Sequence, residues 1–404
     1  MNNWQTFSFE LKHLLRSPFK LVALLLFVLA GGYGLHAGAN LYAEQSAEIE
    51  RIKQETAEHR AEQLAEYDAG VNEGDRLSEP LMAIWLNQIH HYIDPSLLMV
   101  YSVGQAEQYG FYKWTNLRSS PYDADMTMEI ANPERLQVGS LDFAFALLFL
   151  SPLVLLILTY NIGSSEAERG ILPLIEVQAG SRNGWQGARF GFYAGILWLT
   201  VVLLIAYGAV LTPVFSTSAG GWGVTILYST LYLAFWAILF FLVLRRGRSI
   251  MGYTLRMVGR WLLLSFAVPG VIHHWVTLQH PLDLMTEVID VRDETDEMWE
   301  VSDSLKRDYV QSLYPELTGK TIAPRYAEAG FVLWYIMANE PMKASIAVAE
   351  ADQAAKNRLI RMTFPVNPLA FFQNRLNKIA GTHYDDYQEF RTTIQNSIDK
   401  QLHR

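Results

Sequence analysis

The chain has 404 residues, with 32 basic against 41 acidic side chains, a net charge of -9 and no cysteine. The acidic balance argues against a nucleic-acid partner, which needs a basic face. The lack of cysteine excludes thiol catalysis, thiolate metal ligands and disulfides.

Long uncharged apolar runs dominate the sequence. A hydrocarbon layer about 30 Å thick needs about 20 apolar residues per helical crossing, and the uncharged residues 190–244 hold two such runs. The expected crossings are residues 21–43, 143–160, 190–211, 222–244 and 261–278. Leucine-rich runs without alternation exclude barrel strands. The sequence therefore predicts an α-helical integral membrane protein with about five transmembrane helices and two large extracytoplasmic segments, mostly α with a minor α+β part.

Basic residues near the ends of these runs predict the orientation. Lys12, Arg16 and Lys20 precede the first run, and residues 245–260 carry five arginines and no acid. We therefore expect a bacterial cytoplasmic (inner) membrane protein with its N-terminus inside and its C-terminus outside. The first run also resembles a signal peptide with a cleavage site near residues 37–39, so cleavage stays open beside retention as an anchor. The long polar region before the run favours retention.

Four regions follow from this map. They are residues 1–43 (cytoplasmic N-terminus and first crossing), 44–140 (extracytoplasmic stalk and domain), 141–278 (four crossings with a cytoplasmic loop at 161–189) and 279–404 (extracytoplasmic, mainly helical). Residues 44–67 are rich in Ala, Glu and Gln and lack Gly and Pro, which predicts a helical stalk. Such a stalk is either a spacer or a lever that carries motion outward.

Smaller elements are expected within the two outer segments. Residues 81–91 look helical, and residues 95–114 hold a candidate strand. Asn339 is predicted to cap a helix, Asn367 and Pro368 to start another that ends near Gly381, and residues 384–401 to form the last. The apolar residues 331–338 are too few to cross a bilayer, so we assign them to the core of the outer domain.

Three features suggest chemistry, and each has a simpler interpretation. Residues 319–321 read Gly-Lys-Thr like the end of a phosphate-binding loop, but Tyr314 stands where that motif needs glycine. Adjacent histidines at residues 90–91 and 273–274 would diverge on a helix, so no metal site is expected. Asp142 is interpreted as a cap at the start of the second crossing. We expect neither catalytic residues nor a cofactor.

The loop at residues 161–189 is the most informative part of the sequence. It combines a charged helix end, a glycine break and a short amphipathic turn around Trp185 before the third crossing. An ordinary connector on the lipid surface is one interpretation, and a docking element for a soluble partner is the other. The candidate residues for docking are Glu166, Glu168, Arg169, Gly170, Ser181, Arg182, Trp185 and Arg189.

At this loop the chain resembles the permease subunits of ABC-2-type transporters, and more closely the branch that contains DUF3526. The family loop runs Glu-Arg-Glu-x-Gly-Thr-Leu, then Ser-Arg, then Gly-Lys. The matching positions here are Glu166, Glu168, Gly170, Leu172, Ser181, Arg182 and Gly187, with Arg189 near the family lysine. The stretches 101–112, 132–133, 139–143, 367–368 and 380–390 also resemble the family. Arg169, Ile171, Arg256 and Arg260 depart from its pattern, and the usual count of six helices exceeds the five found here.

The resemblance implies a half-transporter without an ATPase of its own. A cytoplasmic ABC ATP-binding subunit would dock on residues 166–189, with residues 181–187 as the coupling helix. A second permease chain, identical or paralogous, would pair with the first. Gly191, Gly195 and Gly208 are candidates for close helix packing. The transporter would export a substrate or work mechanically on an extracytoplasmic protein.

A different class of function stays open. More than half of the chain lies outside on this map, which also suits a membrane-anchored binding or sensor protein, or a maturation scaffold, without an ATPase. An enzyme is the least favoured, because no acid lies deep in a crossing and no set of nucleophile, histidine and acid stands out.

Overall fold

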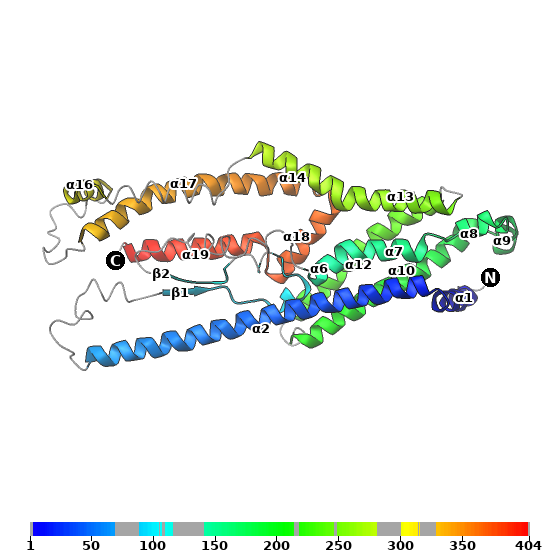
Figure 1. Cartoon of the computed structure of the whole chain (residues 1–404), viewed down its shortest axis with the longest axis horizontal. Helices are drawn as coiled ribbons and strands as arrows, with labels where there is room; N and C mark the ends of the chain where they lie inside the picture. Colours follow the sequence, from blue (N-terminus) through cyan, green and yellow to red (C-terminus); the bar gives the residue numbers. More distant parts are fainter. Residues whose placement is uncertain are drawn as a thin grey trace.

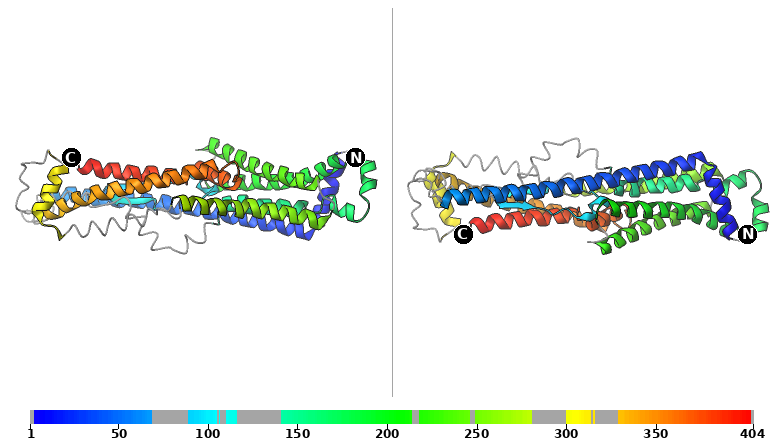
Figure 2. Two further views of the ribbon diagram at one scale, coloured as in Figure 1. Left: turned by 90° about the horizontal axis from the view of Figure 1, so that it is seen from above. Right: turned by 90° about the horizontal axis from the view of Figure 1, so that it is seen from below.

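The computed structural model describes residues 3–68, 89–104, 106, 110–115, 141–213, 218–245, 249–280, 300–313, 315 and 329–402. These residues form an elongated, mostly helical molecule whose two termini lie at opposite ends (Figure 1). One half, the helix bundle, contains the apolar helices. The other half, the distal half, holds the polar extension of the first long helix together with the C-terminal helices. The short helix α1 (Asn3–Leu15) crosses the N-terminal end of the bundle (Figure 2).

Five helices of the bundle are long and apolar enough to cross a membrane. The first is part of α2 (Pro18–Asp68). The second combines α6 (Phe143–Phe145), η3 (Ala146–Leu150) and α7 (Ser151–Thr159). The third and fourth are α10 (Arg182–Leu211) and α12 (Ala219–Arg245). The fifth combines α13 (Ile250–Leu262), η4 (Leu263–Ala267) and α14 (Val268–Gln279).

Helix α2 confirms that the stalk continues the first apolar run without a break. Its 51 residues correspond to a length of about 75 Å at 1.5 Å per residue. The helix therefore runs from the N-terminal end of the bundle far along the distal half (Figure 1).

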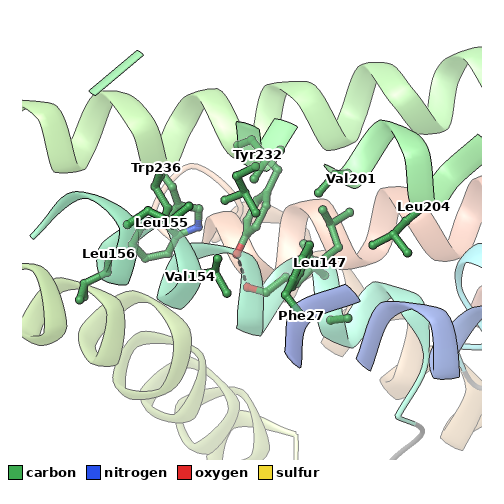
Figure 3. Close-up of a cluster of buried hydrophobic side chains, with 14 of the residues drawn as sticks. Phe27, Leu147, Val154, Leu155, Leu156, Val201, Leu204, Tyr232 and Trp236 are labelled. Atoms are coloured by element: carbon green, nitrogen blue, oxygen red, sulfur yellow. Dashed lines mark hydrogen bonds between the residues drawn. The ribbon is translucent and has the colours of Figure 1, made fainter. Parts of the chain in front are cut away.

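Large buried side chains fill the interior of the bundle (Figure 3). Trp236 and Tyr232 of α12 belong to one buried cluster with Phe27 of α2 and Leu147 of η3, and each is at most 1% exposed. The Tyr232 hydroxyl donates to the carbonyl of Leu148. It thereby satisfies a backbone group in the π-helical segment η3, where the regular bonding pattern changes.

The second π-helical segment, η4, lies in the fifth helix and contacts η3. Trp261 Nε1 donates to the carbonyl of Phe149 across 3.3 Å, and the rings of Phe149 and Phe266 lie 5.7 Å apart. The fifth helix begins at Ile250, so the predicted start at residue 261 was wrong by about three turns. The arginines of α13 suggest the boundary of an apolar run, but the helix continues through them with a polar face.

The distal half combines helices with one small sheet. Strands β1 (Ile89–Tyr92) and β2 (Tyr112–Thr115) pair antiparallel, with Ile89 opposite Thr115. Three helices, α16 (Asp303–Leu313), α17 (Ala329–Met362) and α19 (Tyr384–Leu402), lie along the same half (Figure 1). The strand expected within residues 95–114 is confirmed by β2. The helix expected at residues 81–91 is wrong at its end, which is β1, and residues 81–88 lie outside the described part.

Helix α17 corrects two expectations. It runs through residues 331–338 and through Asn339, so Asn339 is inside a helix and does not cap one. Pro341 is expected in the first turn of the helix that Asn339 would cap, but it lies inside α17.

A junction joins the two halves. It consists of the 3₁₀ helix η2 (Leu97–Tyr101) and α18 (Pro368–Ala380). The predicted boundaries of α18 are confirmed: the Asn367 side chain accepts from the N–H of Ala370 across 3.2 Å, and Gly381 ends the helix at a φ of 67°. The last predicted helix is confirmed as α19.

Candidate functional site

Two short helices lie at the N-terminal end of the molecule, where the second candidate span (Phe143–Glu168) ends. They are α8 (Ser164–Glu168) and α9 (Leu172–Ala179). Gly163 opens α8 with a φ of 78°, and a Cβ there would lie 2.1 Å from Nε2 of the buried Gln186. Glycine suits this turn, because other residues rarely adopt this left-handed backbone conformation.

The segment predicted to be a coupling helix is not a separate element. Residues 181–187 were expected to form a separate turn, but Ser181 is the N-cap of α10 and accepts from the N–H of Gly184 across 3.2 Å. Arg182 and Trp185 therefore lie in the first turns of the third span. The separate short helix of this loop is α9. Glycines 184 and 187 do not end the helix here, since a good N-cap precedes them.

A buried ion cluster joins this loop to the first helix. Arg189 of α10 lies 2.5 Å from Glu10 of α1 and 2.6 Å from Glu166 of α8. The side-chain exposures are 7% for Arg189, 0% for Glu10 and 17% for Glu166. Glu166 also accepts from the N–H of Gly163 across 3.0 Å. One guanidinium thus connects α1, α8 and α10.

A second cation completes the charge balance of the cluster. Lys20, 2% exposed at the start of α2, donates to the carbonyl of Leu158 across 2.7 Å and to Asn161 across 3.2 Å. Its ammonium lies 4.0 Å from the ring centre of Tyr193. His13 Nδ1 is 3.2 Å from the Tyr193 hydroxyl. Burial, followed by the charge of Lys20, lowers the pKa of His13.

The other predicted docking residues occupy different places around this cluster. Glu168 accepts from the N–H of Ile250 across 2.8 Å and so touches the start of α13. Arg182 pairs with Glu176 of α9 at 3.7 Å. The Arg189 guanidinium lies 4.9 Å from the ring centre of Trp185. Arg169 and Gly170 are exposed. The structure therefore brings most of the predicted set together, while these last two face outward.

Apolar side chains lie exposed on and near α9. The exposed fractions are 60% for Leu174 and 82% for Val177, and 80% for Met251 at the start of α13. The small helix α9 thus presents an apolar face that the described part of the chain leaves uncovered.

The three packing glycines separate into two kinds. A Cβ added at Gly208 would lie 2.7 Å from Tyr101 and 2.9 Å from Leu35, so Gly208 packs within this chain. A Cβ at Gly191 or Gly195 would meet no heavy atom of the described residues within 4 Å. Only these two keep a face open for another chain or for lipid.

Two further signals are present in the sequence. Gly34 and Gly38 form a GxxxG pattern in α2, the signature of close helix approach in membranes. A Cβ at Gly34 would lie 2.4 Å from the backbone of Phe143, and one at Gly38 would lie 2.9 Å from the backbone of Val100. The second signal is Glu10, a lone acid among the basic and apolar residues before the first span.

The histidine pairs do not form a metal centre within the described residues. His90 and His91 lie on strand β1 rather than on a helix, and bond to the Tyr112 and Thr115 hydroxyls at 2.7 and 2.9 Å. Residues 273–274 lie in α14. Residues 319–321 lie outside the described part of the chain.

The chain matches no protein-family model, no curated protein and no solved structure. Its function is therefore argued from its own sequence and geometry.

Proposed function

We propose that the chain is the permease subunit of an ABC-2-type ABC transporter, of the branch that contains DUF3526. In this proposal the five apolar helices cross the bacterial inner membrane, and the distal half lies on its outer side. Two observations support the direction. The basic residues of α1 and the arginines of α12 and α13 belong to one end of the bundle, and the termini lie at opposite ends of the molecule (Figure 1).

The main support for an ATPase partner is the arrangement of α8 and α9. These short helices lie at the end of the apolar bundle. The buried cluster of Glu10, Arg189 and Glu166 ties α8 to α1 and α10, and the Arg182–Glu176 pair joins α9 to α10. Leu174 and Val177 offer an exposed apolar face on the same element. A soluble ABC ATP-binding subunit that binds α9 would therefore displace α1 and α10 when it displaces α9.

The proposal divides the work between two chains. ATP hydrolysis takes place in the partner chain, and this chain is a non-catalytic subunit without a cofactor. In this proposal, closure of the ATPase dimer displaces α9, and the Arg182–Glu176 pair passes the displacement to α10. The ion cluster then passes it from α10 to α1 and α8.

A second permease chain, identical or paralogous, completes the transporter in this proposal. The open glycine face of α10 is its contact, because helices in membranes associate where small residues allow close approach. Within one chain, α10 leaves this face uncovered at Gly191 and Gly195.

The long helix α2 can carry movement from the bundle into the distal half. Because it is continuous from the bundle into the distal half, a tilt at one end displaces the other. The transporter either exports a substrate or uses this movement on an extracytoplasmic protein.

The alternative is a membrane-anchored binding, sensor or scaffold protein without an ATPase. The size of the distal half favours it. Copurification from native membranes separates the two, with a tagged chain extracted in mild detergent and its partners identified by mass spectrometry. Recovery of an ATP-binding cassette subunit in stoichiometric amount supports the permease. Recovery of outer partners alone supports the anchor.

A further inference from the structure

Two segments that are far apart in the sequence interlock between the bundle and the distal half. We define the junction wedge as residues 97–104, which include η2, together with α18 and the two residues that follow it, 381–382. Ser102 Oγ donates to Asn377 Oδ1 across 2.6 Å, and Thr382 Oγ1 donates to the carbonyl of Ser102 across 3.0 Å. At Gly104, with a φ of 55°, a Cβ would lie 2.7 Å from Thr382 Oγ1. The two segments therefore fit together with no space to slide.

The wedge is seated in the bundle by aromatic side chains. Tyr101, 2% exposed, donates from its hydroxyl to the carbonyl of Ile205 in α10 across 2.8 Å. Phe372 of α18 packs edge-on against Tyr232 of α12, with ring centres 5.0 Å apart. Tyr232 in turn bonds to η3 of the second span. The wedge thus touches the second, third and fourth spans.

One buried carboxylate joins the wedge to the second span. Asp142 is 5% exposed, and its Oδ1 accepts from the N–H of Phe145 across 2.7 Å as the N-cap of α6. Its Oδ2 accepts from the N–H of Val103 across 2.9 Å. A cap alone needs one acceptor, whereas this carboxylate uses both oxygens on different elements.

Helix α2 contacts both the start of the second span and η2. At Gly34 its backbone meets the backbone of residues 142–143, and at Gly38 it meets Val100. At the other side of the wedge, α18 continues through Gly381 into α19 of the distal half. The wedge therefore stands in the path between the spans and the distal helices.

We infer that the junction wedge is a single transmission element, with Asp142 as the positioning residue that makes it move with the second span. This inference rests on the proposed function for the source of the motion, but not for the existence of the element. Displacement of the second span pulls η2 through Asp142. Because η2 is interlocked with α18, the movement continues into α19.

The test uses the full chain in lipid nanodiscs and hydrogen exchange read by mass spectrometry. Asp142→Ser keeps an N-cap for α6, because serine caps well, but its short side chain cannot also hold Val103. Loss of a bond to a charged acceptor is expected to speed amide exchange about tenfold, both in residues 97–104 and in α18. Exchange in α10 and α12 stays unchanged. Faster exchange confined to residues 142–146, or to η2 without α18, overturns the inference.

A rescue variant guards against general misfolding. A Cβ at Gly381 would lie 3.2 Å from the Cβ of Ser96, a few tenths of an ångström below the usual Cβ spacing of a disulfide, and the chain has no cysteine of its own. Because Gly381 has a φ of 67°, the same variant under reductant is the control for the strain of a side chain there. Ser96→Cys with Gly381→Cys in the Asp142→Ser background should restore slow exchange in both segments, and reductant should remove the effect. Fast exchange that persists in both segments with the disulfide formed contradicts a single element.

The functional part is tested with the copurified ATPase. On ATP binding, exchange in α19 should change in the wild type but not in Asp142→Ser, whereas the response of residues 182–189 remains in both. If no ATPase is recovered, the proposed function fails, and the exchange test on the chain alone still decides whether the wedge is one element. An α19 response that survives in Asp142→Ser overturns the transmission role.

Discussion

Glu10 and Arg189 form an ion pair at 2.5 Å in the interior of the molecule, where Glu10 has no exposed surface. The pair fixes helix α1 against the third span, and Glu166 ties α8 to the same guanidinium at 2.6 Å. Three elements at the N-terminal end therefore depend on one buried cation.

This cluster predicts unequal effects for its members. Arg189→Gln leaves Glu10 and Glu166 buried side by side without their shared cation, and breaking such a pair costs about 3–5 kcal/mol. Glu10→Gln should cost less, because Arg189 keeps Glu166. Melting in detergent, followed by dichroism, measures both. Equal losses would contradict a shared guanidinium.

Two glycines of α10 predict opposite outcomes for the same substitution. Gly208→Leu forces a side chain into Tyr101 and Leu35 and should destabilise the single chain by about 1–3 kcal/mol through overpacking. Gly195→Leu meets open space within the chain, so the monomer should melt normally while the dimer weakens. Mass photometry of both variants in nanodiscs reports the dimer fraction. Unchanged dimer content in Gly195→Leu would remove this face from the interface.

The distal half should lose stability in acid. Burial is the largest cause that lowers the pKa of His90, His91 and His383. Their folded-state pKa values thus lie below the unfolded value of about 6.5. The unfolded chain binds more protons in that window, so stability is full above about pH 6.5 and falls as the pH drops through the folded values.

Limited proteolysis at pH 7.5 and pH 5.5 checks this. Cleavage within residues 89–115 and 384–402 should speed up at the lower pH, and His383→Gln should reduce the difference. His59→Gln, at an exposed position on α2, serves as the control. A pH response that is the same in His383→Gln and in the wild type would exclude this histidine as a cause.

The proposed orientation predicts the location of the C-terminus. A phosphatase reporter that is active only outside the cytoplasm, fused after Arg404, should be active, and the same reporter inserted after Gly170 should be silent. Cytoplasmic activity of a reporter fused to the C-terminus would show another crossing.

The helices of this fold were predictable where local rules decide them. Uncharged runs gave the five apolar helices, and the Asn-Pro start and glycine end gave α18. The predicted starts of the third and fifth spans were wrong for one reason. Arginines were interpreted as the ends of helices, although the helices continue through them. Arg189 stays inside α10 because Glu10 and Glu166 neutralise it, and no local pattern announces that pairing.

Contacts between distant segments could not be predicted from the sequence for a related reason. Asp142 was correctly interpreted as a cap, but its second bond, to Val103, depends on the fold. The GxxxG pattern at Gly34 and Gly38 was readable and would have predicted a close backbone approach. It would not have named the partner, because any backbone can fill such a groove.

The face of α9 gives the most direct test of the permease proposal. Leu174→Glu with Val177→Glu places two charges on the exposed apolar surface, while Val348→Glu, at a 62% exposed position on α17, is the matched control in the distal half. The measurement is the amount of ATP-binding subunit recovered with each tagged chain from native membranes, relative to the wild type. The proposal predicts loss by a factor of about 30 or more, which corresponds to a hot-spot contribution of about 2 kcal/mol or more, with full recovery in the control. Equal recovery from the α9 variant, at equal membrane levels of both chains, would contradict it.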